Sequence, residues 1–268
     1  MTVSDFIADV LPGQLVDSHV HLDVIHTHFP RRISWLKKHC IVPISWSFDP
    51  DIHTCTQLNR YLANQAAFIR ELNSEGFECY FLTGIHPRNI PPELNPDDVR
   101  QMLLPYLENP LCLGLGEIGL ETGSEAEADI LTAQLNLAEF IRSRNKKIGI
   151  HTPRKNKPAV TRKLLGMLDD YQGIESMTVI DHCTNDTIGW VLERGFWTGI
   201  TLSPEKTSVA ELKKIIATRP HAHDRIMCNT DSGVTFSEDF YQFSKNLTVS
   251  EGIRQALTSA NARTFFNL

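Results

Sequence analysis

Histidines and carboxylates recur in this sequence directly after short apolar runs, and side chains of these types bind divalent cations. The first run leads into His19-Val20-His21. Side chains two residues apart on a strand project from the same face, so these two imidazoles can chelate one ion. The other members of the set each follow a later apolar run, and they are His86, Glu117, His151, Asp181-His182 and Asp231.

The set is more informative than any one member, because a single histidine after a strand is often a hydrogen-bonded loop residue and a single carboxylate often caps a helix. Six of the eight strands expected below end in a member of the set. If the fold brings these ends together, unpaired carboxylates and histidines there would repel one another or be difficult to desolvate. A bound divalent cation resolves both problems, so the pattern predicts a metal centre.

Two further histidine pairs lie in sequence contexts that favour metal binding less. His26-Thr27-His28 repeats the spacing of the first pair but lies several residues beyond the first apolar run, and we expect it in a loop at the rim of the site. His221-Ala222-His223 precedes the last apolar run. In a barrel that position lies at the end opposite the site, so we expect a surface feature there.

The elements that must position these residues alternate between two kinds. Eight short runs, several of them apolar without alternation, predict buried strands over 15–20, 41–46, 78–84, 111–117, 147–151, 177–181, 196–202 and 225–229. Apolar residues at three- and four-residue steps predict helical segments over 54–74, 97–108, 125–144, 158–170, 185–193, 204–218 and 250–267. Pro158 and Pro204 suit first-turn positions of two of these helices.

Strands that alternate with helices imply a parallel sheet. Eight such units in a chain of 268 residues predict a closed α/β fold, a (β/α)8 TIM-type barrel, and no linker divides residues 1–268, so we expect a single domain. A doubly wound open sheet is the alternative, but no glycine-rich dinucleotide fingerprint and no phosphate-binding P-loop is present in the sequence. Barrel enzymes carry their catalytic residues at the carboxyl ends of the strands, where the histidines and carboxylates lie.

The overall charge limits the class of partner. With 26 basic and 32 acidic residues the net charge is −6, which argues against a protein that coats DNA non-specifically. The segment from Arg142 to Lys163 nevertheless holds nine basic residues and no acidic one. This basic strip suggests a place for an anionic group, and a solvated helix face is the alternative.

The cysteines and the apolar runs bear on location. The six cysteines are scattered and none forms a CxxC pair, the N-terminus lacks the basic region of a signal peptide, and no apolar stretch reaches 18 residues. We therefore expect a reducing, cytoplasmic location and no membrane partner.

These motifs, in this order, resemble TatD-related metal-dependent hydrolases of the amidohydrolase superfamily. The segments that carry the resemblance span nearly the whole chain and are DSHVHLD at 17–23, GIHP at 84–87, GLGEIGLE at 114–121, HTP at 151–153, IDHC at 180–183, NTDSG at 229–233 and the closing SANARTFFNL. HTPRKNKPAVTRK and FWTGITLSPEK are more similar to a divergent branch of predicted hydrolases than to the DNase members. In DNase members a Ser/Cys-Arg pair usually follows the fifth-strand histidine, whereas Thr152 and Pro153 follow it here.

The resemblance implies a centre with two divalent metal ions. His19, His21, Glu117 and Asp231 would hold one ion, and Glu117, His151 and His182 would hold the other, with Glu117 as the bridge. The lysine that is carbamylated at the fourth strand of some relatives is absent, and Glu117 stands in its place. We expect zinc, and such ligands also accept manganese, magnesium, iron, cobalt or nickel.

Three functions fit these residues. The first is hydrolysis of a phosphate ester, in a nucleotide or nucleic acid, by a water that the binuclear centre activates. The second is hydrolysis of a carboxylic ester, lactone or amide, and the third is a non-catalytic metal-binding scaffold. The complete ligand set and a candidate base weigh against the scaffold, and the basic strip favours phosphate.

Three residues receive roles beyond binding the metal. Asp231 is the candidate catalytic base, because it is expected both to touch a metal and to accept a proton. His86, held by Pro87 in a stiff loop, and Arg154, whose planar fork suits a phosphate or carboxylate, are the candidate substrate-binding residues. The expected partner is a small anionic substrate or a nucleic-acid end, and the sequence leaves the oligomeric state open.

Overall fold

The computed structural model describes residues 15–219, 221–246 and 248–268, and its centre is one parallel sheet with strands in chain order from β1 to β8. The strands are β1 (Val16–Val20), β2 (Val42–Ser45), β3 (Tyr80–Thr83), β4 (Cys112–Gly119), β5 (Lys147–His151), β6 (Thr178–Ile180), β7 (Trp197–Thr201) and β8 (Ile226–Asn229). The segment after β8 returns to β1, where the Asp231 amide donates to the His19 carbonyl at 2.9 Å and the His21 amide donates to the Ser232 carbonyl at 2.8 Å. The expected (β/α)8 barrel is thereby confirmed.

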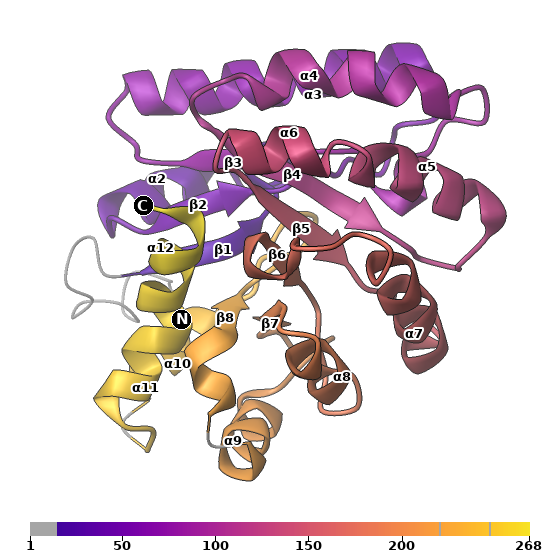
Figure 1. Ribbon diagram of the computed structural model, residues 1–268. Helices are drawn as coiled ribbons and strands as arrows, with labels where there is room; N and C mark the ends of the chain where they lie inside the picture. The colour runs from indigo at the N-terminus through magenta and orange to yellow at the C-terminus, as the bar shows by residue number, and fades with distance from the viewer. Residues whose placement is uncertain (1–14, 220, 247) are drawn as a thin grey trace.

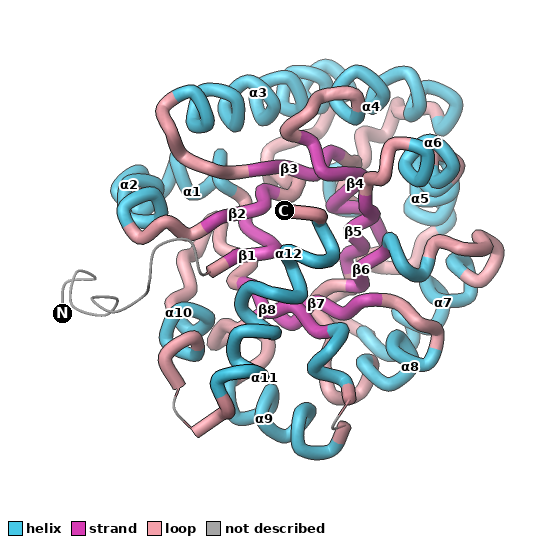
Figure 2. Tube along the Cα trace, turned by 60° about the vertical axis from the view of Figure 1, so that its left-hand side comes forward, coloured by secondary structure: helices cyan, strands magenta, loops and turns pink. Residues whose placement is uncertain are grey.

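Helices surround the barrel on its outer side, as Figures 1 and 2 show. They are α1 (Leu22–His28), α2 (Pro30–Lys38), α3 (Cys55–Ser74), α4 (Val99–Leu107), α5 (Glu125–Leu135), α6 (Ala138–Ser143), α7 (Lys157–Leu168), α8 (Ile188–Glu193), α9 (Val209–Thr218), α10 (Asp239–Phe243), α11 (Glu251–Gln255) and α12 (Asn261–Phe266). Because these helices cover the strands, nearly every strand residue is buried, which accounts for the apolar runs without alternation. None of the described helices combines the length and apolar character that crossing a membrane requires.

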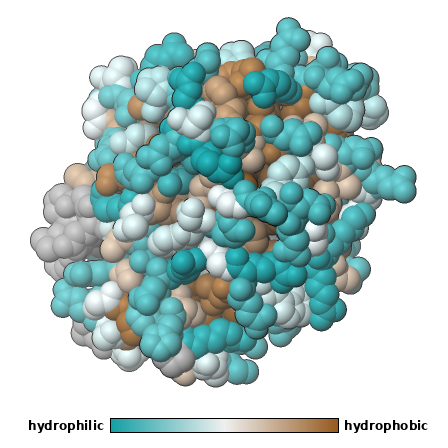
Figure 3. Space-filling model, viewed as in Figure 1, coloured by the Kyte–Doolittle hydropathy of each residue, from teal (hydrophilic) through white to brown (hydrophobic). Residues whose placement is uncertain are grey.

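The barrel interior is filled and closed at the end away from the candidate site. Its apolar cluster joins Val16 and Val42, near the start of their strands, to Phe265 and Phe266 of α12. Figure 2 shows α12 lying across this opening. The face drawn in Figure 3 is mostly hydrophilic, with hydrophobic residues in patches between the polar ones. Among the described residues, Val234 is the large hydrophobic residue that is exposed.

Three local expectations were wrong. The His26-Thr27-His28 segment is the end of α1 rather than a loop, because Leu22 and Ile25 bury one side of a helix that begins directly after β1. The segment 125–144 divides into α5 and α6 around Asn136. The helix expected from Pro204 begins at Val209 instead, because Ser208 and Glu211 form a capping box there.

Candidate metal centre

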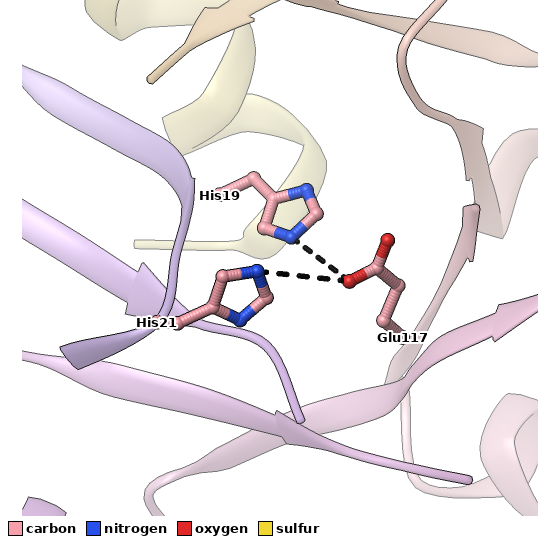
Figure 4. Close-up of side chains that lie close together, drawn as sticks. All are labelled: His19, His21 and Glu117. Atoms are coloured by element: carbon pink, nitrogen blue, oxygen red, sulfur yellow. Dashed lines mark ion pairs between the residues drawn. The ribbon is translucent and has the colours of Figure 1, made fainter. Parts of the chain in front are cut away.

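The expected residues come together at one mouth of the barrel, at the carboxyl ends of six strands, with Glu117 at the centre. Glu117 Oε2 lies 3.3 Å from His19 Nε2 and 3.8 Å from His21 Nε2 (Figure 4). Its other oxygen, Oε1, lies 2.6 Å from His151 Nδ1 and 3.3 Å from His182 Nε2. His86 Nε2 also lies 3.5 Å from Oε1. Each oxygen of this carboxylate thus faces different histidines, which is the arrangement that a bridging ligand needs.

The donor atoms fit divalent cations. Three groups have their ligand atoms within 4.8 Å of one another, and they are His19, His21 and Glu117; His19, His182 and Asp231; and His86, Glu117 and His151. His19 Nε2 is buried and lies 3.3 Å from Glu117 Oε2 and 3.5 Å from Asp231 Oδ1, so one imidazole nitrogen and two carboxylates converge on one point. Imidazole nitrogens and carboxylate oxygens of this kind suit zinc and other transition metals.

The hydrogen bonds of the two β1 histidines leave Nε2 of each ring available as a ligand. His19 Nδ1 lies 2.5 Å from Asp181 Oδ2, and His21 Nδ1 lies 2.9 Å from the Trp46 carbonyl oxygen. Since carboxylate and carbonyl oxygens accept, both Nδ1 atoms carry the proton. The Trp46 indole also stacks on the His19 ring at 4.0 Å, which fixes the plane of that ring.

A chain of buried hydrogen bonds determines the tautomer of His182 in the same way. The Asn229 amide nitrogen donates to both oxygens of Asp181 at 3.0 Å, so the amide oxygen of Asn229 must accept from the Thr201 hydroxyl at 2.8 Å. The Thr201 oxygen then accepts from His182 Nδ1 at 2.7 Å. His182 Nε2 is left with its lone pair directed to the site.

Removal of the hydroxyl in this chain should weaken metal binding without removing a ligand. Thr201→Val is expected to lower affinity for the ion held by His182 about 10- to 100-fold, the usual effect of losing a group that orients a ligand. Thr201→Ser keeps the hydroxyl and should bind within a few-fold of the wild-type protein. Competition with a chromogenic chelator gives the affinities, and nitrogen NMR of His182 reports its tautomer. Equal affinity in the valine and wild-type proteins would contradict this role.

His151 and His86 differ in what they offer to the site. His151 Nε2 lies 2.7 Å from Glu121 Oε2 and its Nδ1 lies 2.6 Å from Glu117 Oε1, so each nitrogen faces a carboxylate and Nδ1 is the one directed to the site. His86 Nδ1 instead accepts from the Arg88 backbone amide at 3.0 Å. The neutral His86 ring must therefore carry its hydrogen on Nε2, a buried atom that lies 3.5 Å from Glu117 Oε1. In this tautomer His86 can donate a hydrogen bond to the site.

Charge in the cluster is unevenly divided among the histidines. Burial favours a neutral His19, but Glu117 and Asp181 outweigh it and raise the pKa of His19 to about 10. Burial lowers the pKa of His86 to about 4. Burial and the neighbouring Lys206 ammonium lower the pKa of His182 to about 3. Without a metal ion, His19 is therefore protonated at neutral pH while the other two rings are neutral.

Metal binding at His19 is expected to release a proton, because Nε2 must lose its hydrogen before its lone pair can bind an ion. With a pKa of about 10 the proton persists throughout the neutral range, so metal affinity should rise about tenfold per pH unit from about pH 6 to about pH 9. Titration calorimetry with Zn²⁺ in buffers of different ionisation enthalpy counts the protons released. An affinity that becomes constant above about pH 7, as for an ordinary histidine, would contradict the prediction.

Two of these residues have strained backbones. His182 and Asp231 have φ angles of 57° and 48°, in the left-handed region that costs a residue other than glycine about 1–3 kcal/mol. The His182 amide is held by Asp181 Oδ1 at 2.6 Å. Asp181 in turn fits only because β7 has a glycine, since a Cβ at Gly199 would lie 2.1 Å from Asp181 Oδ1.

A cavity of about 180 Å³ opens beside the ligand cluster. It is lined by His21 and Asp231 and by three cationic side chains, Arg88, Arg154 and Lys206. Arg154 was expected here from the sequence. The rest of the basic strip does not form one face, because β5 divides it, and its members 142–147 lie at the opposite end of that strand from Arg154.

Sequence reasoning assigned no role to several residues that the structure places in or around the site. These are Arg88, Glu121, Thr201, Lys206 and Asn229. Asp181 belonged to the set that predicted the metal centre, and the structure places it against His19 Nδ1. Asn229 is the last residue of β8 and Glu121 ends the GLGEIGLE segment, so their positions carried a signal. Nothing in the sequence indicated a role for Thr201 or Lys206 except their position in or just after the seventh strand.

Comparisons with known proteins agree with this geometry. A family model described as TatD related DNase matches residues 16–235. An uncharacterized metal-dependent hydrolase of Methanocaldococcus jannaschii is 28% identical over 272 residues, covering 95% of this chain and 100% of the relative. The crystal structure of a TatD-like protein from Archaeoglobus fulgidus has a TM-score of 0.73 and 27% identity, covering 94% of this chain and 100% of that one. A manganese-bound dihydroxybenzoic acid decarboxylase from Polaromonas has a TM-score of 0.66 at 12% identity, covering 96% of this chain and 98% of that one, and shares the fold alone.

Proposed function

The chain belongs to the TatD-related DNase family and is a metal-dependent hydrolase of that type, and from this premise we propose that it hydrolyses a phosphate ester of a small anionic substrate or a nucleic-acid end. The observation that carries the proposal is the cavity beside His21 and Asp231, which Arg88, Arg154 and Lys206 line together with Glu205. The lining has three cationic side chains against the carboxylates of Glu205 and Asp231, and this excess of positive charge favours an anionic substrate.

The cofactors in this proposal are two divalent ions, with zinc as the first choice. His19, His21, Glu117 and Asp231 would hold one ion, and Glu117, His151 and His182 the other. The division of the Glu117 oxygens between the two histidine pairs supports this assignment. When bound, such ions activate water and stabilise charge that develops on the scissile group.

The side chains of the chain itself divide the remaining tasks. Asp231 Oδ1, which lies 3.0 Å from His21 Nε2, accepts the proton of the attacking water. His86 donates a hydrogen bond from Nε2 to a substrate oxygen, since its other nitrogen is held by the Arg88 amide. Arg154 binds the anionic oxygens farther from the scissile bond.

Loss of the Arg154 guanidinium should impair binding of anionic substrates selectively. Arg154→Ala is expected to raise KM about 10- to 100-fold, because a charge-assisted hydrogen bond is lost, while kcat changes little. Lys155→Ala is the matched control, since Lys155 is exposed and does not line the cavity. Unchanged KM values for every anionic substrate that the protein turns over would exclude this subsite.

Hydrolysis of a carboxylic ester, lactone or amide is the second candidate, because the same ions polarise a carbonyl group. The observation that favours it is the Thr152-Pro153 pair after His151, where DNase members usually have a Ser/Cys-Arg pair. It predicts turnover of uncharged esters that does not depend on Arg154.

The deciding experiment is a substrate screen of protein with known metal content. Elemental analysis identifies and counts the bound ions, and the reloaded protein is then tested on phosphate monoesters, single-stranded DNA, carboxylic esters and lactones. Activity confined to phosphate esters supports the proposal. Activity confined to carbonyl substrates overturns it in favour of the second candidate.

A further inference from the structure

Lys206, in the loop after β7, places its ammonium group inside the ligand cluster. Its Nζ donates to Asp231 Oδ2 and lies 3.1 Å from Nδ1 and 3.4 Å from Nε2 of His182. These similar distances place the ammonium over the imidazole rather than in line with one nitrogen, as expected where Nδ1 already donates to Thr201. The side chains of Lys206 and Asp231 are 14% and 12% exposed, so this ion pair is largely withdrawn from solvent.

A divalent ion and this ammonium compete for the negative charge of Asp231, although they approach different oxygens: Oδ1 lies 3.0 Å from His21 Nε2, and Oδ2 accepts from Lys206. The carboxylate belongs with His19 and His182 to a group whose ligand atoms lie within 4.8 Å of one another. A protonated lysine has no lone pair to offer a metal, and its charge repels a divalent ion at such short range. Repulsion by an ion bound to this group should therefore weaken the bond from the ammonium to Asp231 Oδ2 and favour movement of the ammonium away from the ion.

The cavity determines where the displaced ammonium can go. Lys206 lines it together with Arg88 and Arg154, and the flexible four-carbon stem of a lysine allows the charge to move without movement of the backbone. The Arg88 guanidinium is held over the Phe48 ring at 4.6 Å. A substrate anion between these groups offers Lys206 a second partner in place of Asp231.

We propose that Lys206 is an exchangeable cation, which neutralises Asp231 in the metal-free protein and binds an anionic oxygen of a phosphate-monoester substrate once the metal is bound. The inference rests on the proposed function, because it takes Asp231 as a metal ligand. It adds that one side chain, Lys206, weakens the binding of the metal ion and strengthens the binding of phosphate. A lysine with a purely structural role would instead support the binding of the metal ion and of phosphate alike.

The test compares Lys206→Met with the wild-type protein, because methionine keeps much of the stem and removes the charge. Titration calorimetry measures Zn²⁺ binding to the metal-free proteins and inorganic phosphate binding to the metal-saturated ones. Without its competitor, Zn²⁺ should bind Lys206→Met about tenfold more tightly, and phosphate should bind about 10- to 100-fold more weakly. Lys155→Met, a change of the same kind at an exposed position outside the cavity, should alter neither affinity.

Opposite changes in the two affinities support the proposal. Weaker binding of both ligands would overturn it in favour of a structural role, and unchanged metal affinity would overturn the exchange. Tighter Zn²⁺ binding with unchanged phosphate binding would overturn the substrate role. Neither measurement requires turnover, so a protein that shows both changes but hydrolyses no phosphate ester would contradict only the proposed function.

Discussion

Glu117→Gln is expected to abolish activity and to weaken the binding of both metal ions more than 100-fold. The amide loses the negative charge, and only one of its two terminal atoms can still act as a ligand, whereas each Glu117 oxygen faces a separate histidine pair. Loss of a group that only orients a ligand typically costs 10- to 100-fold, so loss of the shared ligand should exceed that range. Elemental analysis after dialysis and a chelator competition measure the effect.

Two control variants test whether this result is specific to the bridging role of Glu117. Among the described residues the Glu121 carboxylate contacts His151, so Glu121→Gln should weaken the binding of one ion and leave the other. Glu139→Gln, at an exposed position of α6, should leave metal content unchanged. Full occupancy by two ions in the Glu117→Gln protein would refute the bridging role.

Asp231→Asn should leave the second ion bound, through Glu117, His151 and His182, and yet lower kcat by about 10²- to 10⁴-fold, the typical contribution of a general base. Asparagine has nearly the same shape but cannot accept the proton. In the native chain the pKa of Asp231 is held well below its ordinary value, against the effect of burial, by Lys206 and His182, so the carboxylate is ionised at neutral pH.

Metal content and turnover must be measured on the same Asp231→Asn sample. Asp224→Asn, at an exposed position before β8, is the control for an aspartate without contact to the site. If the Asp231→Asn protein holds both ions and turns over within a few-fold of the wild type, Asp231 is not the base. Water activation would then depend on the metal ions alone.

The sequence was sufficient for the architecture and for the residue types at the mouth of the barrel. Eight buried runs alternating with helical segments imply parallel strands, and the carboxyl ends of parallel barrel strands meet at one mouth. His19 and Asp231, 212 positions apart in the chain numbering, therefore had to be neighbours, and His19 Nε2 lies 3.5 Å from Asp231 Oδ1. Local boundaries were less certain, because α1 follows β1 without a loop and its apolar side has only a few residues.

Only the tertiary structure decided which nitrogen of each histidine is available and which charges surround it. A histidine tautomer depends on the partner of its other nitrogen. For His19 that partner is Asp181, from a different strand end, and for His182 it is Thr201 of β7, held in turn by Asn229. The same holds for Lys206, whose contact with Asp231 crosses from the loop after β7 to the loop after β8. Residue spacing along one strand does not contain such information, because these contacts form only when neighbouring strands close the barrel.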